Sequence, residues 1–228
     1  MPSVYTPSAF KNLADSLKPA FPKLAPMQLM QMGIEASQED QAANQSFSQT
    51  HIGYRLSKSD DSRVLQIRHD GFAYSHMAPY TDWDTFRAEA YPLWLRYKEA
   101  CPGALATRCA VRYINRVDIP GKTIEIEDYF KLHPEIPDSL PQPDVVGMTM
   151  MLQMPQSDLG CMAVINQSQV PPIQPDHVAV LLDIDVFRLA IETWTDSELW
   201  EFLDKLRLRK NEIFEGCITD RMRELIDR

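Results

Sequence analysis

The sequence predicts an α+β fold, an antiparallel sheet with two long helices on one face. Segments whose apolar residues alternate, as they do in strands, come first, and a long segment with helical spacing follows them. This order occurs twice along the 228 residues, which predicts a pseudo-repeat of one unit of strands followed by a helix. A hydrophobic content of 44% in a chain of this length is enough for a substantial buried core.

Residues 1–46 predict a helix and a loop, and their pattern does not place a strand before residue 47. Pro7 suits the first turn of a helix, which is expected over residues 8–18. The apolar residues of that helix recur at helical spacing: Phe10, Leu13 and Leu17. Residues 35–46 are polar and predict a mobile loop.

Residues 47–228 predict a single α+β domain made of two similar halves, residues 47–132 and 144–228. In the first half we expect strands at 47–57, 63–69, 72–77 and 107–119, a helix from Trp83 to Tyr97 and a helical turn within 125–132. Pro92 should kink or divide that helix. A proline-rich connection, 133–143, leads to the second half, where we expect strands at 145–154, 160–167 and 178–187 and a helix to about residue 217. That helix begins at a capping box, Thr195-Asp-Ser-Glu198, and residues 218–226 either continue it or form a second short helix.

The segment Thr107–Pro120 is the longest strand-like run near the middle of the chain, and its two faces differ in character. One face is apolar apart from a single amide: Cys109, Val111, Tyr113, Asn115, Val117 and Ile119. The other face is charged: Arg108, Arg112, Arg116 and Asp118. We therefore expect the first face to meet the core and the guanidinium groups to point outward.

Two interpretations of the charged face remain open. Asp183 and Asp185 share one face of the strand at 178–187, so the arginines and aspartates are expected on the same side of the sheet. They then form a solvated ladder of ion pairs, which we favour, or the arginines bind a phosphate or carboxylate ligand. Asn115 is interpreted as a buried amide that fixes strand register, with a ligand contact as the alternative.

The sequence favours no cofactor and no metal. Asp183 and Asp185 could hold Mg²⁺ with a phosphorylated substrate, but the chain lacks the glycine–serine phosphate loop that such an enzyme uses. A second acidic pair, Glu125 and Glu127, is interpreted as surface charge. The five histidines show no metal-binding spacing, and no glycine-rich nucleotide loop or nucleophile motif is present.

Charge and composition narrow the expected partners and location. A formal net charge of −9 makes nucleic acid an unlikely partner, and no apolar run has the length of a membrane span. The four cysteines are scattered and no secretory signal is recognisable, so we expect reduced thiols and a cytoplasmic protein.

Several stretches resemble a sporadically distributed prokaryotic family of unknown function. Ala110-Val-Arg-Tyr-Ile-Asn-Arg-Val-Asp-Ile-Pro120 is similar to its signature L-R-Y-I-N-x-I-x-I-P. Further similar stretches are Gly53-Tyr-Arg, Val64-Leu-Gln-Ile-Arg-His-Asp-Gly-Phe72, Pro79-Tyr-Thr-Asp-Trp83, Glu127-Asp-Tyr-Phe130, Pro134-Glu-Ile-Pro137, Leu182-Asp-Ile-Asp-Val-Phe187 and Asn211-Glu-Ile-Phe-Glu-Gly-Cys-Ile-Thr-Asp-Arg-Met-Arg-Glu-Leu225. The resemblance spans about residues 47–226 and implies family membership but no reaction.

Family members open with an apolar strand-like segment that residues 1–34 do not clearly supply. Without it, one edge of the first half-sheet would be an unpaired docking surface. Because a complete α+β core is recognisable and no catalytic constellation is, we expect a non-enzymatic binding or protein-interaction module with a protein partner or a homo-oligomeric state. The alternative is a domain that binds a phosphorylated small molecule or a nucleotide, and a further possibility within it is that the domain also hydrolyses this ligand. The ligand-binding residues would be Arg108, Arg112, Arg116, Asn115, Asp183 and Asp185.

Overall fold

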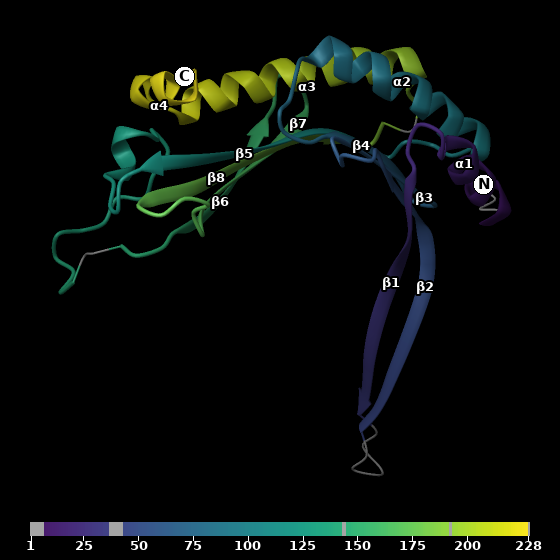
Figure 1. Cartoon of the computed structure of the whole chain (residues 1–228), viewed down its shortest axis with the longest axis horizontal. Helices are drawn as coiled ribbons and strands as arrows, with labels where there is room; N and C mark the ends of the chain where they lie inside the picture. Colours follow the sequence, from purple (N-terminus) through teal and green to yellow (C-terminus); the bar gives the residue numbers. More distant parts are fainter. Residues whose placement is uncertain (1–6, 37–42, 143–144, 192, 228) are drawn as a thin grey trace. The chain divides into compact units, whose positions relative to one another are not determined.

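The computed structural model describes residues 7–36, 43–142, 145–191 and 193–227 of the chain. The described residues form four α-helices, a short 3-10 helix and eight strands (Figure 1). They fall into two compact units, residues 1–104 and 105–228, and each unit contains one four-stranded antiparallel sheet.

The first unit is a strand meander with a helix before and after it. Its elements are α1 (Pro7–Leu17), β1 (Lys23–Ala36), β2 (Ala43–Ser57), β3 (Arg63–Arg68), β4 (Gly71–His76) and α2 (Trp83–Ala100). The strands lie in the order β1-β2-β3-β4, so each hairpin connection joins neighbours. Asp82 caps α2 by accepting a hydrogen bond from the Thr85 amide, and the helix continues through Pro92 as one element.

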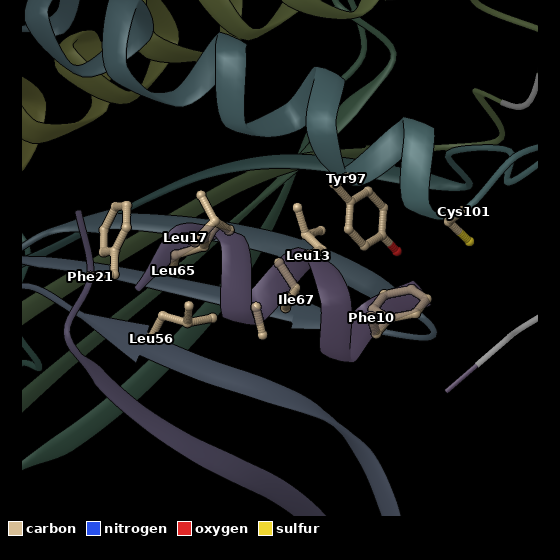
Figure 2. Close-up of a cluster of buried hydrophobic side chains, with 10 residues drawn as sticks. Phe10, Leu13, Leu17, Phe21, Leu56, Leu65, Ile67, Tyr97 and Cys101 are labelled. Carbon is tan, nitrogen blue, oxygen red and sulfur yellow. The ribbon is translucent and has the colours of Figure 1, made fainter. Parts of the chain in front are cut away.

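Both helices of this unit pack into one apolar cluster (Figure 2). α1 contributes the face predicted from its spacing, in which Phe10 is fully buried and Leu13 and Leu17 nearly so. The sheet and the end of α2 supply the other side of the cluster: Leu56, Leu65, Ile67, Tyr97 and Cys101. The Tyr97 hydroxyl donates to the carbonyl of Arg68, so its polar end is satisfied within the apolar surroundings.

The second unit begins with the arginine-rich strand and ends with two helices. Its elements are β5 (Arg108–Pro120), the 3-10 helix η1 (Ile126–Asp128), β6 (Thr149–Gln156), β7 (Cys161–Val170), β8 (His177–Leu189), α3 (Asp196–Cys217) and α4 (Asp220–Ile226). The strand order is β5-β8-β7-β6, so β5 pairs with the last strand of the unit over its whole length. α3 packs against β5 and β8 and starts at the capping box predicted at Thr195 and Glu198.

The structure confirms the α+β class and corrects how its parts were grouped. The strands form two sheets instead of one, because β5 pairs with β8 and not with β4. The boundary between the units therefore lies at residues 104 and 105, whereas the sequence predicted halves of 47–132 and 144–228 within one domain. The two strand orders differ, and they do not establish the predicted pseudo-repeat.

The N-terminal prediction was wrong in one respect. The helix expected over residues 8–18 is α1, but β1 precedes residue 47, and the first unit therefore does have an opening strand. The prediction failed because β1 is rich in methionine and glutamine and has a proline, so its alternation is weak. Strand pairing reaches Ala36 and resumes at Ala43, so residues 35–36 and 43–46 of the predicted mobile loop belong to strands. The rest of that predicted loop, residues 37–42, lies outside the described residues.

Candidate functional site

The charged face of β5 lies against the aspartates of β8, as predicted. Pairing places Arg112 directly opposite Asp185 and Ile114 opposite Asp183, so Arg112 reaches diagonally to Asp183. Arg112 Nε lies 2.8 Å from Asp183 Oδ1 and Nη2 lies 2.6 Å from Oδ2, a two-pronged ion pair. Hydrogen bonding to Asp183 raises the pKa of the Arg112 guanidinium above its ordinary value.

Burial differs strongly between the two partners of this pair. The side chain of Asp183 is 6% exposed, whereas that of Arg112 is 56% exposed. The guanidinium therefore covers the carboxylate on the outer face of the sheet. A buried carboxylate depends on its counter-charge, so Arg112 has a structural role that the sequence alone could only suggest.

The second pair is held by one hydrogen bond, and its carboxylate is more exposed than that of Asp183. Arg108 Nη2 lies 2.8 Å from Asp185 Oδ2, and its guanidinium also lies over the ring of Phe187, 4.4 Å from the centroid. The side chains of Arg108 and Asp185 are 44% and 22% exposed. The other carboxylate oxygen of Asp185 is buried and has no hydrogen-bond partner among the described residues.

The remaining two predicted site residues do not join these pairs. Arg116 binds Asp118, two residues along the same strand, and donates to the carbonyl of Pro171. Asn115 faces the other side of the sheet, where its Nδ2 donates to the carbonyl of Leu182 on β8 at 3.1 Å. That contact ties β5 to β8 by a side chain in addition to the backbone ladder, as the structural interpretation of Asn115 expects.

Four of the six predicted residues thus form two ion pairs between β5 and β8. Arg116 forms an ion pair within its own strand, and Asn115 bonds to the backbone of β8. Both guanidinium groups nearest the aspartates already carry intramolecular carboxylate partners, which compensate the positive charge that would attract a phosphate. Within the described parts of the chain, no group of three or more histidine, cysteine, aspartate or glutamate side chains is arranged to hold a metal ion. Glu127 falls in η1, the helical turn that was predicted there.

Sequence reasoning missed a polar cluster in the first unit. Glu89 of α2 accepts hydrogen bonds through one oxygen from Arg63 Nε at 2.8 Å, from the Tyr74 hydroxyl and from His76 Nε2 at 2.8 Å. Burial opposes ionisation of Glu89, but these three donors together lower its pKa to about 2. The sequence did contain a sign of this cluster, because alternation places Tyr74 and His76 on the same face of β4. The strand register, which only the structure shows, then puts Arg63 opposite His76.

The second missed residue is a buried lysine under the sheet of the second unit. Lys210 of α3 is 7% exposed, and its Nζ lies 3.5 Å from the centroid of the Tyr113 ring on β5. Burial lowers the pKa of this amine to about 8. Lys210 follows Leu206 by four residues, so its place on the apolar face of the helix could have been recognised from spacing.

The most distinctive surface of the first unit is a two-stranded ribbon, defined as residues 28–36 of β1 and 43–52 of β2. β2 pairs with β3 only from Gly53 to Ser57, so the ribbon continues beyond the four-stranded part of the sheet (Figure 1). No charged residue occurs from Leu24 to Ile34, and none occurs from Gln41 to Tyr54 apart from a histidine at 51.

Three large apolar side chains on the ribbon are exposed. Leu29 is 46% exposed, Met30 63% and Phe47 62%. A two-stranded ribbon without a packed face has little stability of its own in water. The ribbon therefore combines apolar surface, open strand edges and an absence of charge.

Gly53 marks the base of the ribbon. Its φ is 151°, and a Cβ built on it would lie 2.1 Å from the carbonyl oxygen of Ile67 on β3. The pairing of β1 with β2 shifts register between Met27 and Gln28, at the same level. A bulge and a close backbone approach together redirect the two strands away from β3.

A shallow cleft of about 360 Å³ lies in the second unit. The guanidinium of Arg188 lies over the rings of Trp194 and Phe202 in its wall, 4.9 and 5.4 Å from their centroids, and donates to the carbonyl of Leu159. This cation therefore already occupies the aromatic surface of the cleft.

No helix within the described residues combines the length and apolar character that crossing a membrane requires.

Comparison with known proteins gave no match: no family model, no curated protein and no solved structure is significantly similar to the chain.

Proposed function

We propose that this chain is a protein-interaction module that docks through its two-stranded ribbon. The observation that carries the proposal is that the ribbon leaves the sheet with exposed Leu29, Met30 and Phe47 and with no charged residue along the β1 stretch from 24 to 34. Natural edge strands are normally protected against pairing by charge, proline or a covering element. An unprotected ribbon is the form expected where pairing with another protein is the purpose.

A partner would stabilise the ribbon in two ways, by main-chain hydrogen bonds and by burial of apolar side chains. Main-chain groups along the open edge of β1 would be paired, and the exposed apolar side chains would be removed from water at about 25 cal/mol per Å². The first unit supplies the rigid support, because its core fixes the base of the ribbon through Leu56 and Leu65 on β2 and β3. The family resemblance adds no activity to this proposal.

The alternative function, binding of a phosphorylated small molecule by the arginine strand, has weaker support. Arg112 and Arg108 are bound to Asp183 and Asp185 within the chain. A thermal-shift series with phosphate, nucleotides and divalent cations tests it. A shift in the wild type that is lost in Arg112→Ala, beyond the lowered stability of the variant itself, would favour ligand binding.

Site-specific photo-crosslinking in the native cell tests the docking proposal directly. A photoreactive phenylalanine analogue replaces Phe47 in the ribbon, and the matched control replaces Tyr91, which is 40% exposed on α2. We expect one defined adduct from position 47 and none of comparable yield from position 91. Equal yields at both positions, or no adduct at position 47, would contradict a docking role for the ribbon.

A further inference from the structure

We infer that the partner of the ribbon is a second copy of this chain, whose β1 pairs antiparallel with β1 around a two-fold axis at Leu29. This inference rests on the proposed function and names its partner. It starts from the outer edge of β1, which is the first strand in its sheet and pairs with β2 on one side only among the described residues. From Met27 to Ile34 this edge carries neither a charge nor a proline.

Self-pairing places a strict condition on a strand. In an antiparallel pair related by a two-fold axis, residue i lies opposite residue j and j lies opposite i, so a charge near the axis meets its own copy. The uncharged stretch of β1 runs from Leu24 to Ile34, and its midpoint is Leu29. Pairing about this midpoint therefore brings no like charges together.

The charges that end this stretch have opposite signs. Position 23 is a lysine and position 35 is a glutamate, and both lie six residues from Leu29. A two-fold axis at Leu29 sets position 23 of each copy opposite position 35 of the other. Lys23 already has a carboxylate partner in its own chain, Asp61, so the register is selected mainly by centring the uncharged stretch on the axis, with the opposite signs of positions 23 and 35 adding to it.

The geometry also agrees with the one proline of β1. Pro26 lacks a backbone N–H, so it limits continuous ladder pairing. With the axis at Leu29, residues 27–31 of each copy pair between the two prolines. At the level of Leu29 the junction is then four-stranded, with β2 and β1 of one copy followed by β1 and β2 of the other.

The first experiment uses the full chain and asks whether position 29 meets itself. Opposite residues in an antiparallel pair have Cα atoms about 4.5–5.5 Å apart, within reach of a disulfide. Leu29→Cys is therefore expected to give an oxidised covalent dimer in high yield. The four native cysteines are buried, which makes the wild type a clean baseline.

Two control variants test which register the two β1 strands adopt and which edge of the ribbon pairs. Gln31→Cys places its thiols about 13 Å apart along the paired strands, and we expect little dimer from it. Ser48→Cys lies opposite Gln31 on β2 and reports on pairing through the other edge of the ribbon. Equal dimer yields from Leu29→Cys and Gln31→Cys, or a higher yield from Ser48→Cys, would overturn pairing about Leu29.

Charge complementation provides an independent readout by light scattering. Leu29→Lys and Leu29→Glu are each expected to be monomers, because the axis brings two like charges together, and their mixture is expected to recover the dimer. Position 29 is exposed in the single chain, so neither change should alter the circular dichroism of the monomer. A wild type that remains monomeric at about 100 μM would overturn the inference.

Failure of the self-pairing inference can be distinguished from failure of the proposed docking function. If the chain is monomeric and the adduct at Phe47 contains a different protein, docking through the ribbon stands and the second copy is wrong. If the chain is monomeric and Phe47 gives no adduct, both are wrong.

Discussion

Removal of the Arg112 guanidinium should destabilise the second unit far more than removal of the Arg108 guanidinium. Arg112 makes two hydrogen bonds to a carboxylate that is 6% exposed, whereas Arg108 makes one to a carboxylate that is 22% exposed. Arg112→Ala leaves Asp183 on the sheet without its counter-charge. Arg108→Ala leaves Asp185 more accessible to water.

The magnitude follows from burial and distance. At an effective dielectric constant of about 20, unit charges about 4 Å apart interact by about 4 kcal/mol, and loss of one partner of a buried pair costs about 3–5 kcal/mol. The Arg112 side chain is 56% exposed, so water enters the vacated space and recovers part of this free energy. We expect Arg112→Ala to lower the free energy of unfolding by about 2–3 kcal/mol, and Arg108→Ala by about 0.5–1 kcal/mol.

The assay is urea unfolding followed by tryptophan fluorescence. Because Trp83 and Trp94 belong to the first unit, replacing both by phenylalanine leaves Trp194 and Trp200 as reporters of the second unit. The paired change Arg112→Met with Asp183→Leu removes the buried charge together with its partner, and it should recover most of the lost stability. If the Arg112→Ala variant is as stable as the wild type, the ion pair has no structural role, and the Arg112 guanidinium of the wild type would then be available for a ligand.

Three further changes test other parts of the fold. Burial lowers the pKa of Lys210 to about 8, so the protonated amine costs free energy that the Tyr113 ring only partly returns, and Lys210→Met should raise stability at pH 7 by about 1 kcal/mol. Because the folded pKa lies below the unfolded value, wild-type stability rises between about pH 8 and 10.5, and denaturation at both pH values should show the advantage of the variant shrinking. The pKa of Glu89 is lowered to about 2, so its ionised form stabilises the first unit above about pH 4.5; Glu89→Gln should remove about 1–2 kcal/mol there and flatten the loss on acidification towards pH 2, and a pH-independent cost would contradict this. Gly53→Ala places a Cβ 2.1 Å from the Ile67 carbonyl oxygen at positive φ, and we expect a fall of several degrees in Tm by calorimetry, whereas an unchanged Tm would mean that the base of the ribbon differs from that described.

The sequence was sufficient where local periodicity decided the outcome. Alternation along β5 correctly separated Arg112 from Tyr113 and Asn115, because a period of two follows from strand geometry alone. The capping box at Thr195 follows equally from local hydrogen bonding, whereas the sequence left open whether residues 218–226 continue α3 or form the separate helix α4. The ladder was also predictable, since Asp183 alternates with buried neighbours in the same way.

The sequence was insufficient where pairing between distant segments decided the outcome. β5 and β8 are separated by more than fifty residues, and no local pattern states that they are neighbours, so the arginine strand was assigned to the wrong half. β1 was missed for a related reason. Its residues alternate weakly, and its extended form depends on pairing with β2 across the hairpin.

The two units use charge in opposite ways, and this contrast gives the last prediction. In the second unit, the outer face of the sheet keeps its arginines bound to its own aspartates, so that face offers little free charge to a partner. In the first unit the ribbon has no charge between Leu24 and Ile34. Association through the ribbon would therefore depend on main-chain pairing and apolar burial, which salt does not screen.

Ionic strength separates this mode of association from any mode based on the arginine strand. Raising salt from about 0.05 to 0.5 M should change the dissociation constant of the ribbon-mediated complex by less than about threefold, since the paired residues 27–31 carry no charge. Sedimentation equilibrium at the two salt concentrations measures this directly. A dissociation constant that rises by an order of magnitude or more would show that charged side chains, and not the ribbon, hold the complex together, because only interactions between exposed charges weaken in this range.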